Sequence, residues 1–351
     1  MNCRVVTIFC SWGSIPEPKN NKMKKHRIPK GILPIVFICI AMIGCDEGNE
    51  IVKGPQPDKN ALIEFFNSSA DTRKQAFTVD ASTGGSIVGS QGTVLQFSAN
   101  QFLTESGDGV SGEVDIELIE IYNRSSMLLT KKPTNGKMEN GAIGTLVSGG
   151  EFYVNAFQDG VQLKLVSGFT IVAPTKNTGD VDQDMRQFGG TVACEGDDCD
   201  VTWEEKKDRG IEIGEFQGPG GVQSAYFTFQ SQFGWTNIDR WFSDPRPKTT
   251  IFIGVPEGFD STNCTVFIAY DGEPTALGRF DRYDDQKGMF TEHYGLIPIG
   301  LKAHIILISI IEDEIHYAIQ GATISENHEE VIKGVQSITE EELTNLIDGL
   351  P

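Results

Sequence analysis

The stretch "EFYVNAFQDGVQLKLV", residues 151–166, predicts the structural unit from which the rest of the fold can be worked out. Apolar residues alternate on both sides of its central Asp159-Gly160: Phe152, Val154 and Ala156 before it, and Val161, Leu163 and Leu165 after it. Alternation with a period of two indicates β-strands, and Asp-Gly between such strands is typical of a type I′ turn. We therefore expect a β-hairpin centred on residues 159–160.

The stretch "GEVDIELIEIY", residues 112–122, also alternates, but its phase changes halfway along. Val114, Ile116 and Leu118 share one phase, whereas Ile119 and Ile121 share the other. A β-bulge inserts one extra residue into a strand and produces such a change. The pattern predicts a bulge near residues 118–119.

Composition favours strands throughout the chain. Its 39 glycines separate segments rich in Val, Ile, Phe and Thr, which is typical of strands joined by tight turns. Helical signals are short: "ALIEFF" at 61–66, and "SITEEELTNLIDGL" near the end, where Thr339 and Glu342 have the spacing of a capping box. We predict a mainly β protein with a short C-terminal helix.

The predicted strands fall into two groups. The chain after residue 44 is long for a single core and suits two antiparallel β domains. The first is expected at 77–173 as a β-sandwich, and the second at 223–351 with the terminal helix. Residues 174–222 contain "CEGDDCD" and "GPGG" and are expected to form an acidic, glycine-rich connection.

The N-terminal segment has the pattern of an export signal. Basic residues at 22–30 precede 14 residues, 31–44, that are mostly apolar and contain Pro34. A membrane span needs about 20 apolar residues, so this segment is too short. A basic region, a short apolar region and a small residue at the break are typical of a secretory signal peptide.

The end of that segment, Met42-Ile43-Gly44-Cys45, resembles the lipobox of bacterial lipoproteins. The resemblance implies a signal peptide over 1–44, cleavage before Cys45, and lipidation of that cysteine, followed by a lipidated tether over 45–76. Since Met23 is the natural start of such a signal, residues 1–22 are interpreted as an upstream extension outside the translated protein. The alternative is an ordinary signal peptide with an incidental cysteine.

Two further stretches carry a family resemblance. The segment "FTVDASTGGSIVGSQGTVLQFSANQFLTESGDGVSGEVDIELIEIY" and, later, "FGWTNIDRWFSDPRPKT" at 233–249 resemble uncharacterised β-rich lipoproteins of Gram-negative cell surfaces. The first resemblance covers about residues 77–173, and its glycine pattern is also similar to the β-sandwich module of ankyrins and netrin receptors. Neither likeness implies an activity.

The acidic residues after Cys45 bear on where the protein is located and exclude nucleic acids as partners. Residues 1–44 hold seven of the 29 basic residues and one of the 49 acidic ones, which leaves 22 basic and 48 acidic side chains from Cys45 onward. Such a body repels phosphate backbones, so no nucleic-acid partner is expected. Asp46-Glu47, with Glu50 nearby, resembles the export tag of surface lipoproteins. We expect an outer-membrane lipoprotein displayed at the surface, with a periplasm-facing protein as the alternative.

Cys194 and Cys199 flank a short acidic loop, "EGDD". In an oxidising compartment they are candidates for a local disulfide. Two free thiols or a metal-binding pair are the alternatives, but a zinc site needs about four ligands and the histidines lie far away in the sequence. No metal or cofactor is expected.

The stretch "QSQFGWTNIDRWFSDPRP" contains the candidate binding residues Trp235, Asn237, Asp239, Arg240 and Trp241. Indole rings stack on sugars, and the polar side chains between them donate or accept hydrogen bonds, but aromatic residues also build cores.

The sequence predicts a non-catalytic binding or scaffold protein of the cell envelope. Its expected partners are the membrane, through the lipid, and a glycan or another envelope protein. The alternative is a glycan hydrolase that uses carboxylates near residues 233–247, because such carboxylates leave no local motif.

Overall fold

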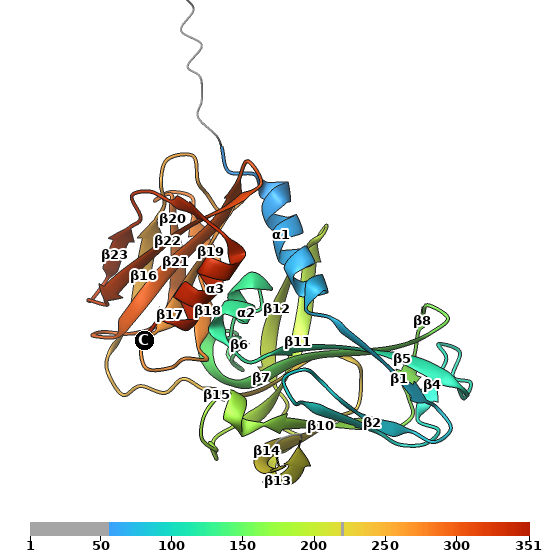
Figure 1. Ribbon diagram of the computed structural model, residues 1–351. Helices are drawn as coiled ribbons and strands as arrows, with labels where there is room; N and C mark the ends of the chain where they lie inside the picture. The colour runs from blue at the N-terminus through green and yellow to red at the C-terminus, as the bar shows by residue number, and fades with distance from the viewer. Residues whose placement is uncertain (1–55, 219–220) are drawn as a thin grey trace, which may run out of the picture. The chain divides into compact units, whose positions relative to one another are not determined.

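The computed structural model describes residues 56–218 and 221–351, which belong to one compact unit (Figure 1). The protein is mainly β, with several sheets, a small five-stranded barrel and a short C-terminal helix. None of the helices in this part of the chain has the length and apolar character of a membrane span. The expected signal segment and Cys45 lie outside the described residues.

The largest sheet contains eight strands and supplies the framework of the molecule. Its main path runs β1-β5-β7-β15-β11-β12-β6, and β8 pairs with β7. The strands are β1 (Gln75–Asp80), β5 (Glu113–Ile121), β6 (Asn135–Lys137), β7 (Ile143–Gln158), β8 (Val161–Gln162), β11 (Arg186–Glu195), β12 (Asp198–Glu205) and β15 (Gly234–Trp241).

The short strand β6 closes part of this sheet into the barrel. It pairs parallel with β12 and antiparallel with β7, so β7, β15, β11, β12 and β6 form a ring. A Cβ atom at Gly136 would lie 2.8 Å from both Leu146 Cγ and Trp241 Cη2, so only glycine fits there. Leu146, Phe188, Val201 and Trp203 form the buried apolar cluster of this ring.

The hairpin expected at 159–160 is confirmed. Gln158 of β7 pairs with Val161 of β8, and both turn residues have positive φ, 52° at Asp159 and 77° at Gly160. Positive φ at both central positions is the signature of a type I′ turn.

The bulge expected at 118–119 is wrong. Strand β5 keeps a continuous register with β7 across those residues, and its pairing with β1 is regular up to Leu118. The apolar pattern changes phase because the second half of β5 is buried on both faces: Leu118 contacts one apolar core and Ile119 contacts another. The register shift of this sheet occurs instead between β7 and β15, where Ser148 to Glu151 lie opposite Asp239 to Asn237.

A five-stranded sheet faces the large one, in the order β13-β14-β10-β3-β2. Its strands are β2 (Gly85–Val88), β3 (Val94–Phe97), β10 (Phe169–Pro174), β13 (Glu212–Gly218) and β14 (Gly221–Gln230). Leu95 and Ile171 from this sheet join Ile116 and Phe152 from the large one in a single apolar core. A two-stranded pair, β4 (Phe102–Leu103) with β9 (Lys164–Leu165), lies beside them.

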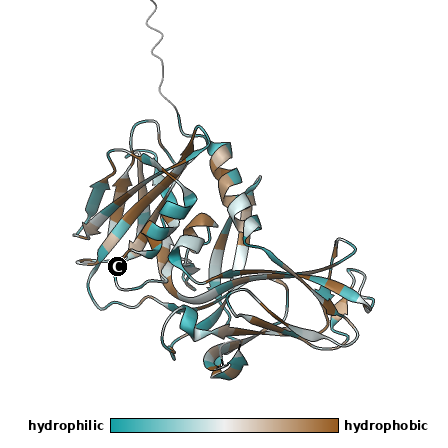
Figure 2. Ribbon diagram, in the orientation of Figure 1, coloured by the Kyte–Doolittle hydropathy of each residue, from teal (hydrophilic) through white to brown (hydrophobic). Residues whose placement is uncertain are grey.

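Two further sheets form the C-terminal region. One contains β16 (Lys248–Gly254), β19 (Arg282–Asp284), β20 (Met289–Pro298) and β23 (His328–Val331), and the other contains β17 (Cys264–Tyr270), β18 (Leu277–Arg279), β21 (Lys302–Ile311), β22 (Glu314–Thr323) and β24 (Gln336–Ile338). Hydrophobic residues follow these strands (Figure 2), and Ile253, Val266 and Ile305 belong to the apolar core of this region. The pairing of β16 with β23 is parallel.

Three α-helices contribute to a third core, which joins the two groups of sheets. They are α1 (Lys59–Thr72), α2 (Arg124–Leu129) and α3 (Glu340–Asp348), and a single 3-10 turn, η1, covers Thr175–Asn177. Ile119 of β5, Phe267 of β17 and Leu343 of α3 belong to this core. The capping box at Thr339 and Glu342 is present as predicted.

Regular structure extends into segments that were expected to be connections. Helix α1 contains the helical signal at 61–66 and extends to Thr72 within the expected tether; Asp58 Oδ1 accepts from the N–H groups of Asn60 and Ala61 and caps it. Strands β11, β12 and β13 lie within the expected acidic connection. Val201 and Trp203 of β12 are buried between more exposed acidic residues, so the segment is amphipathic rather than uniformly solvated.

Candidate functional site

Strand β15 carries all five candidate residues. Trp235, Asn237, Asp239 and Trp241 alternate along it and therefore share one face, whereas Arg240 lies on the other. Asn237 and Asp239 are fully buried, and both tryptophans are half-buried. Only the two ends of this row are therefore accessible.

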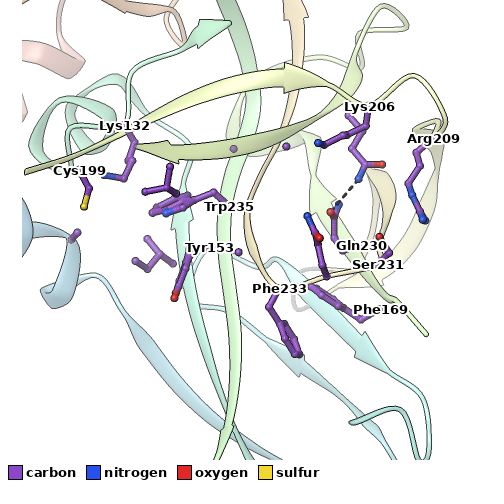
Figure 3. A pocket seen from close by; sticks show the side chains of 18 of the residues that line it. Lys132, Tyr153, Phe169, Cys199, Lys206, Arg209, Gln230, Ser231, Phe233 and Trp235 are labelled. Carbon is purple, nitrogen blue, oxygen red and sulfur yellow. Dashed lines mark hydrogen bonds between the residues drawn. The ribbon is translucent and has the colours of Figure 1, made fainter. Parts of the chain in front are cut away.

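Trp235 lines a pocket of about 810 Å³ between β7, β11, β14, β15 and the end of α1 (Figure 3). Its ring lies 5.3 Å from that of Tyr153, its register partner on β7, with a tilt of 46°. The buried Trp203 packs edge-on behind it at 6.3 Å. A Cβ atom at Gly190 would lie 2.6 Å from Trp235 Cβ, so this glycine allows the indole to pack against β11. Trp235 and Tyr153 form an apolar platform in the pocket.

Amide side chains supply hydrogen-bonding groups in another part of the same pocket. Gln187, Gln230 and Gln232 line the pocket, and Gln187 Nε2 donates to Gln230 Oε1 at 3.1 Å. Gln187 is only 3% exposed, and its Oε1 has no hydrogen-bond partner within the described part of the chain. A buried, unpaired acceptor is unfavourable, so this oxygen favours a ligand that donates a hydrogen bond.

Four basic side chains line the pocket: Lys74, Lys132, Lys206 and Arg209. Lys132 is buried, and its Nζ lies 5.5 Å from the Trp235 ring centroid and donates to the Thr130 carbonyl at 3.0 Å. Burial, helped by the neighbouring Lys131, lowers the pKa of Lys132 to about 8. An anion in the pocket would favour the charged form of this ammonium.

Two carboxyl groups are buried on the face of the sheet that carries Trp235. Glu151 lies opposite Asn237, and Asp239 accepts a hydrogen bond from the Asn237 amide. Burial raises the pKa of both carboxyl groups, and the nearby Asp239 raises that of Glu151 further. Among the described residues, neither oxygen of Glu151 has a hydrogen-bond partner. Both side chains have zero exposure, so they shape the electrostatics of the site from within the protein.

Trp241 belongs to a different pocket, a more open one of about 1010 Å³ between β6 and β12. Its Nε1 donates to Glu205 Oε2 at 3.3 Å. Ion pairs surround it: Lys137 with Glu204 at 3.0 Å, and Lys207 with Glu139. The two tryptophans therefore lie in separate pockets, which share the lining residues Lys206 and Asp208.

Arg240 and the cysteine pair have structural positions. Arg240 contacts Asp182 at 2.7 Å and Glu273 at 3.0 Å, which ties β15 to two loops. Cys194 and Cys199 form a disulfide that closes the β11–β12 hairpin, and Cys199 reaches the edge of the Trp235 pocket.

Lys132, Gln187 and Glu151 were missed from the sequence. Lys132 lies in the loop after α2, Gln187 on β11 and Glu151 on β7, so no local motif connects them. Glu151 and Tyr153 alternate with apolar residues and therefore have the pattern of a solvent-facing side. In the structured part of the chain, no group of three or more His, Cys, Asp or Glu residues could hold a metal ion.

Comparison with known proteins adds no family to these observations. No family model matches the chain, and the search of the curated proteins found no significant match.

Proposed function

We propose that this protein is a lipid-anchored binding protein of the bacterial cell envelope and that the Trp235 pocket binds a saccharide. The observation that carries the proposal is the half-buried indole of Trp235, 5.3 Å from Tyr153, in the same pocket as the unpaired Gln187 Oε1. Aromatic faces bind the apolar face of a sugar ring, and amides bind its hydroxyl groups. The pocket offers both.

Burial of the carboxyl groups supports binding over hydrolysis. A glycosidase needs two carboxyl groups that reach the glycosidic bond. Asp239, the carboxylate considered for the alternative hydrolase, is fully buried, as is Glu151. A glycan seated on Trp235 would have no contact with either group.

The anchor and the domain division are parts of the same proposal. Its basis is the resemblance of residues 1–45 to a lipoprotein signal, the acidic Asp46-Glu47 and the likeness to surface lipoproteins. Of the two proposed antiparallel domains, the first would be a β-sandwich made by the two sheets that share the core around Leu95 and Phe152. Its boundary would follow β15, because that strand pairs with β7 and β11.

Binding is tested by titrating the full-length protein, purified in detergent, with a saccharide array and then by calorimetry. Trp235→Ala should weaken saccharide binding at least about tenfold, because aromatic contacts contribute on the order of 1 kcal/mol beyond buried area. Trp241→Ala is the matched control, since it lies on the same strand face but in another pocket, and it should bind normally. Trp235→Phe should restore part of the affinity. Equal binding by all variants would place the saccharide elsewhere.

Anchoring is tested by incorporation of labelled palmitate. The wild type should be labelled and Cys45→Ser should not. Protease treatment of intact cells should then remove the protein if it is displayed at the surface, and should leave it intact if it faces the periplasm.

A further inference from the structure

The charge of the Trp235 pocket is opposite to that of the protein. The sequence has 49 acidic and 29 basic residues, yet the pocket is lined by four basic side chains and two acidic ones, Asp71 and Asp208. A basic pocket in an acidic protein concentrates anions locally, because field lines are focused in a concave, poorly solvated site.

Two of the four cations are already paired. Lys74 lies 3.4 Å from Asp71 and 3.6 Å from Glu117, and Arg209 lies 3.7 Å from Asp208. Lys132 and Lys206 differ: within residues 56–218 and 221–351, no carboxylate oxygen lies within 4.0 Å of either ammonium. Lys132 is buried and donates to the Thr130 carbonyl, so Lys206, which is half-buried, is the ammonium open to a ligand.

The two cations lie in different parts of the pocket: Lys132 lies near Trp235, and Lys206 lies on the opposite face of β11, because neighbouring strand residues point to opposite faces. In Figure 3, Lys132 and Lys206 project from separate segments. The Lys206 side chain crosses β11 directly over Gly189, where a Cβ atom would lie 2.2 Å from Lys206 Cε. The missing side chain at residue 189 therefore determines where the Lys206 ammonium lies.

We infer that the pocket is specific for an anionic oligosaccharide, one ring of which stacks on Trp235 while a negative group farther along the pocket contacts Lys206. This inference rests on the proposed function and adds the ligand class to it. Carboxylate and sulfate groups both provide oxygen atoms that accept charge-assisted hydrogen bonds from an ammonium. Uronic acids carry the first group and sulfated sugars carry the second, so these two classes of sugar are the candidate ligands.

The test compares three oligosaccharides of equal length: an oligogalacturonate, a sulfated oligosaccharide and the neutral cellohexaose. The full-length protein in detergent is titrated at about 50 mM and about 500 mM NaCl, because salt screens exposed charges. At least one anionic oligosaccharide should bind about tenfold more tightly than cellohexaose at low salt, and high salt should reduce the difference. The anionic oligosaccharide that binds more tightly identifies the charged group.

Three variants assign the effect to Lys206. Lys206→Gln should weaken binding of the anionic oligosaccharide about tenfold, as expected for one charge-assisted contact, without changing neutral binding. Lys207→Gln is the matched control: it removes the same charge at the next residue, which lines only the Trp241 pocket. Gly189→Ala keeps the charge but displaces the flexible end of Lys206, so it should also weaken anionic binding. Thermal unfolding checks that each variant is folded.

The outcomes separate the two levels of the proposal. If cellohexaose binds as tightly as the anionic oligosaccharides and Lys206→Gln has no effect, the charge inference is wrong while saccharide binding stands. If none of the oligosaccharides binds, the proposed function fails and the inference fails with it. If inorganic sulfate binds as tightly as the sulfated oligosaccharide, the site recognises the anion alone and the saccharide part is overturned.

Discussion

Two buried glutamates on neighbouring strands show how differently the two faces of the large sheet are built. Glu120 of β5 pairs with Phe152, and Glu151 of β7 pairs with Ile121, so the two side chains point to opposite faces. Glu120 accepts from the N–H groups of Gln91 at 3.1 Å and Thr93 at 3.0 Å, and from Gln75 Nε2 at 2.8 Å. Within the described residues, Glu151 accepts from none.

The difference separates a carboxylate that stabilises the fold from one whose burial destabilises it. Glu120 satisfies the backbone of the β2–β3 turn and holds it against β5. Glu151 makes no hydrogen bond that offsets its desolvation, and only the charge of the nearby Lys132 opposes it. Proteins retain such local conflicts mainly at functional sites. It lies two residues before Tyr153, on the same strand face, which connects it to the Trp235 pocket.

The largest effect is expected from Glu120→Gln. The amide NH₂ of glutamine would face N–H donors, so we expect a loss of about 3 kcal/mol in the free energy of unfolding, measured with urea. Glu117→Gln on the same strand is the control, because Glu117 is only half-buried and pairs with Lys74 at 3.6 Å. It should lose less than about 1 kcal/mol. Equal losses would contradict a structural role specific to Glu120.

Glu151→Gln should instead increase the free energy of unfolding, and the size of the increase should depend on pH. Burial raises the pKa of Glu151 above its ordinary 4.5, so the folded state retains a proton that the unfolded state releases. Stability of the wild type therefore falls as the pH rises above about 4.5, with a slope of up to about 1.4 kcal/mol per pH unit from this group.

The variant lacks this group, so it should gain stability relative to the wild type as the pH rises above about 5, measured by urea unfolding. The wild type and the variant share the contribution of Asp239, whose pKa is also raised. Parallel pH profiles would show that Glu151 is not the responsible group.

The smallest effect is expected from Thr339→Ala at the start of α3. Loss of an N-cap costs about 1 kcal/mol, and Thr339→Ser should retain the cap. Asp348 at the end of α3 accepts from the backbone and hydroxyl of Ser125 in α2, the helix before Lys132. A weakened α3 should loosen these contacts with α2. Amide hydrogen exchange should therefore become faster in α2, on the Glu151 side, and remain unchanged in β3, on the Glu120 side. Uniformly faster exchange would contradict this separation.

Sequence reasoning succeeded where the signal is local. The Asp159-Gly160 turn and the capping box of Thr339 involve residues within a few positions of each other, and the structure has both. It failed where burial comes from distant segments. The phase change after Leu118 resembles a bulge, but it arises because α1, α2 and β17 cover the second face of β5.

The candidate site shows the same limit. Trp235 was identified from its aromatic neighbours in the sequence, but Trp241 from the same stretch belongs to another pocket. Lys132, Gln187 and Lys206 join Trp235 only because β15 pairs with β7 and β11 and because β6 closes the barrel. A three-residue strand such as β6 has too little pattern to predict its partners.

The sequence by itself determined the strand-rich class, the tight turns, the terminal helix and the strong negative charge, because composition, side-chain alternation and capping depend on neighbouring residues. Only the tertiary structure decided which face of each strand is buried and which cations remain unpaired around Trp235. Those properties depend on contacts between segments far apart in the chain, and burial changes the energy of a charge far more than sequence position does.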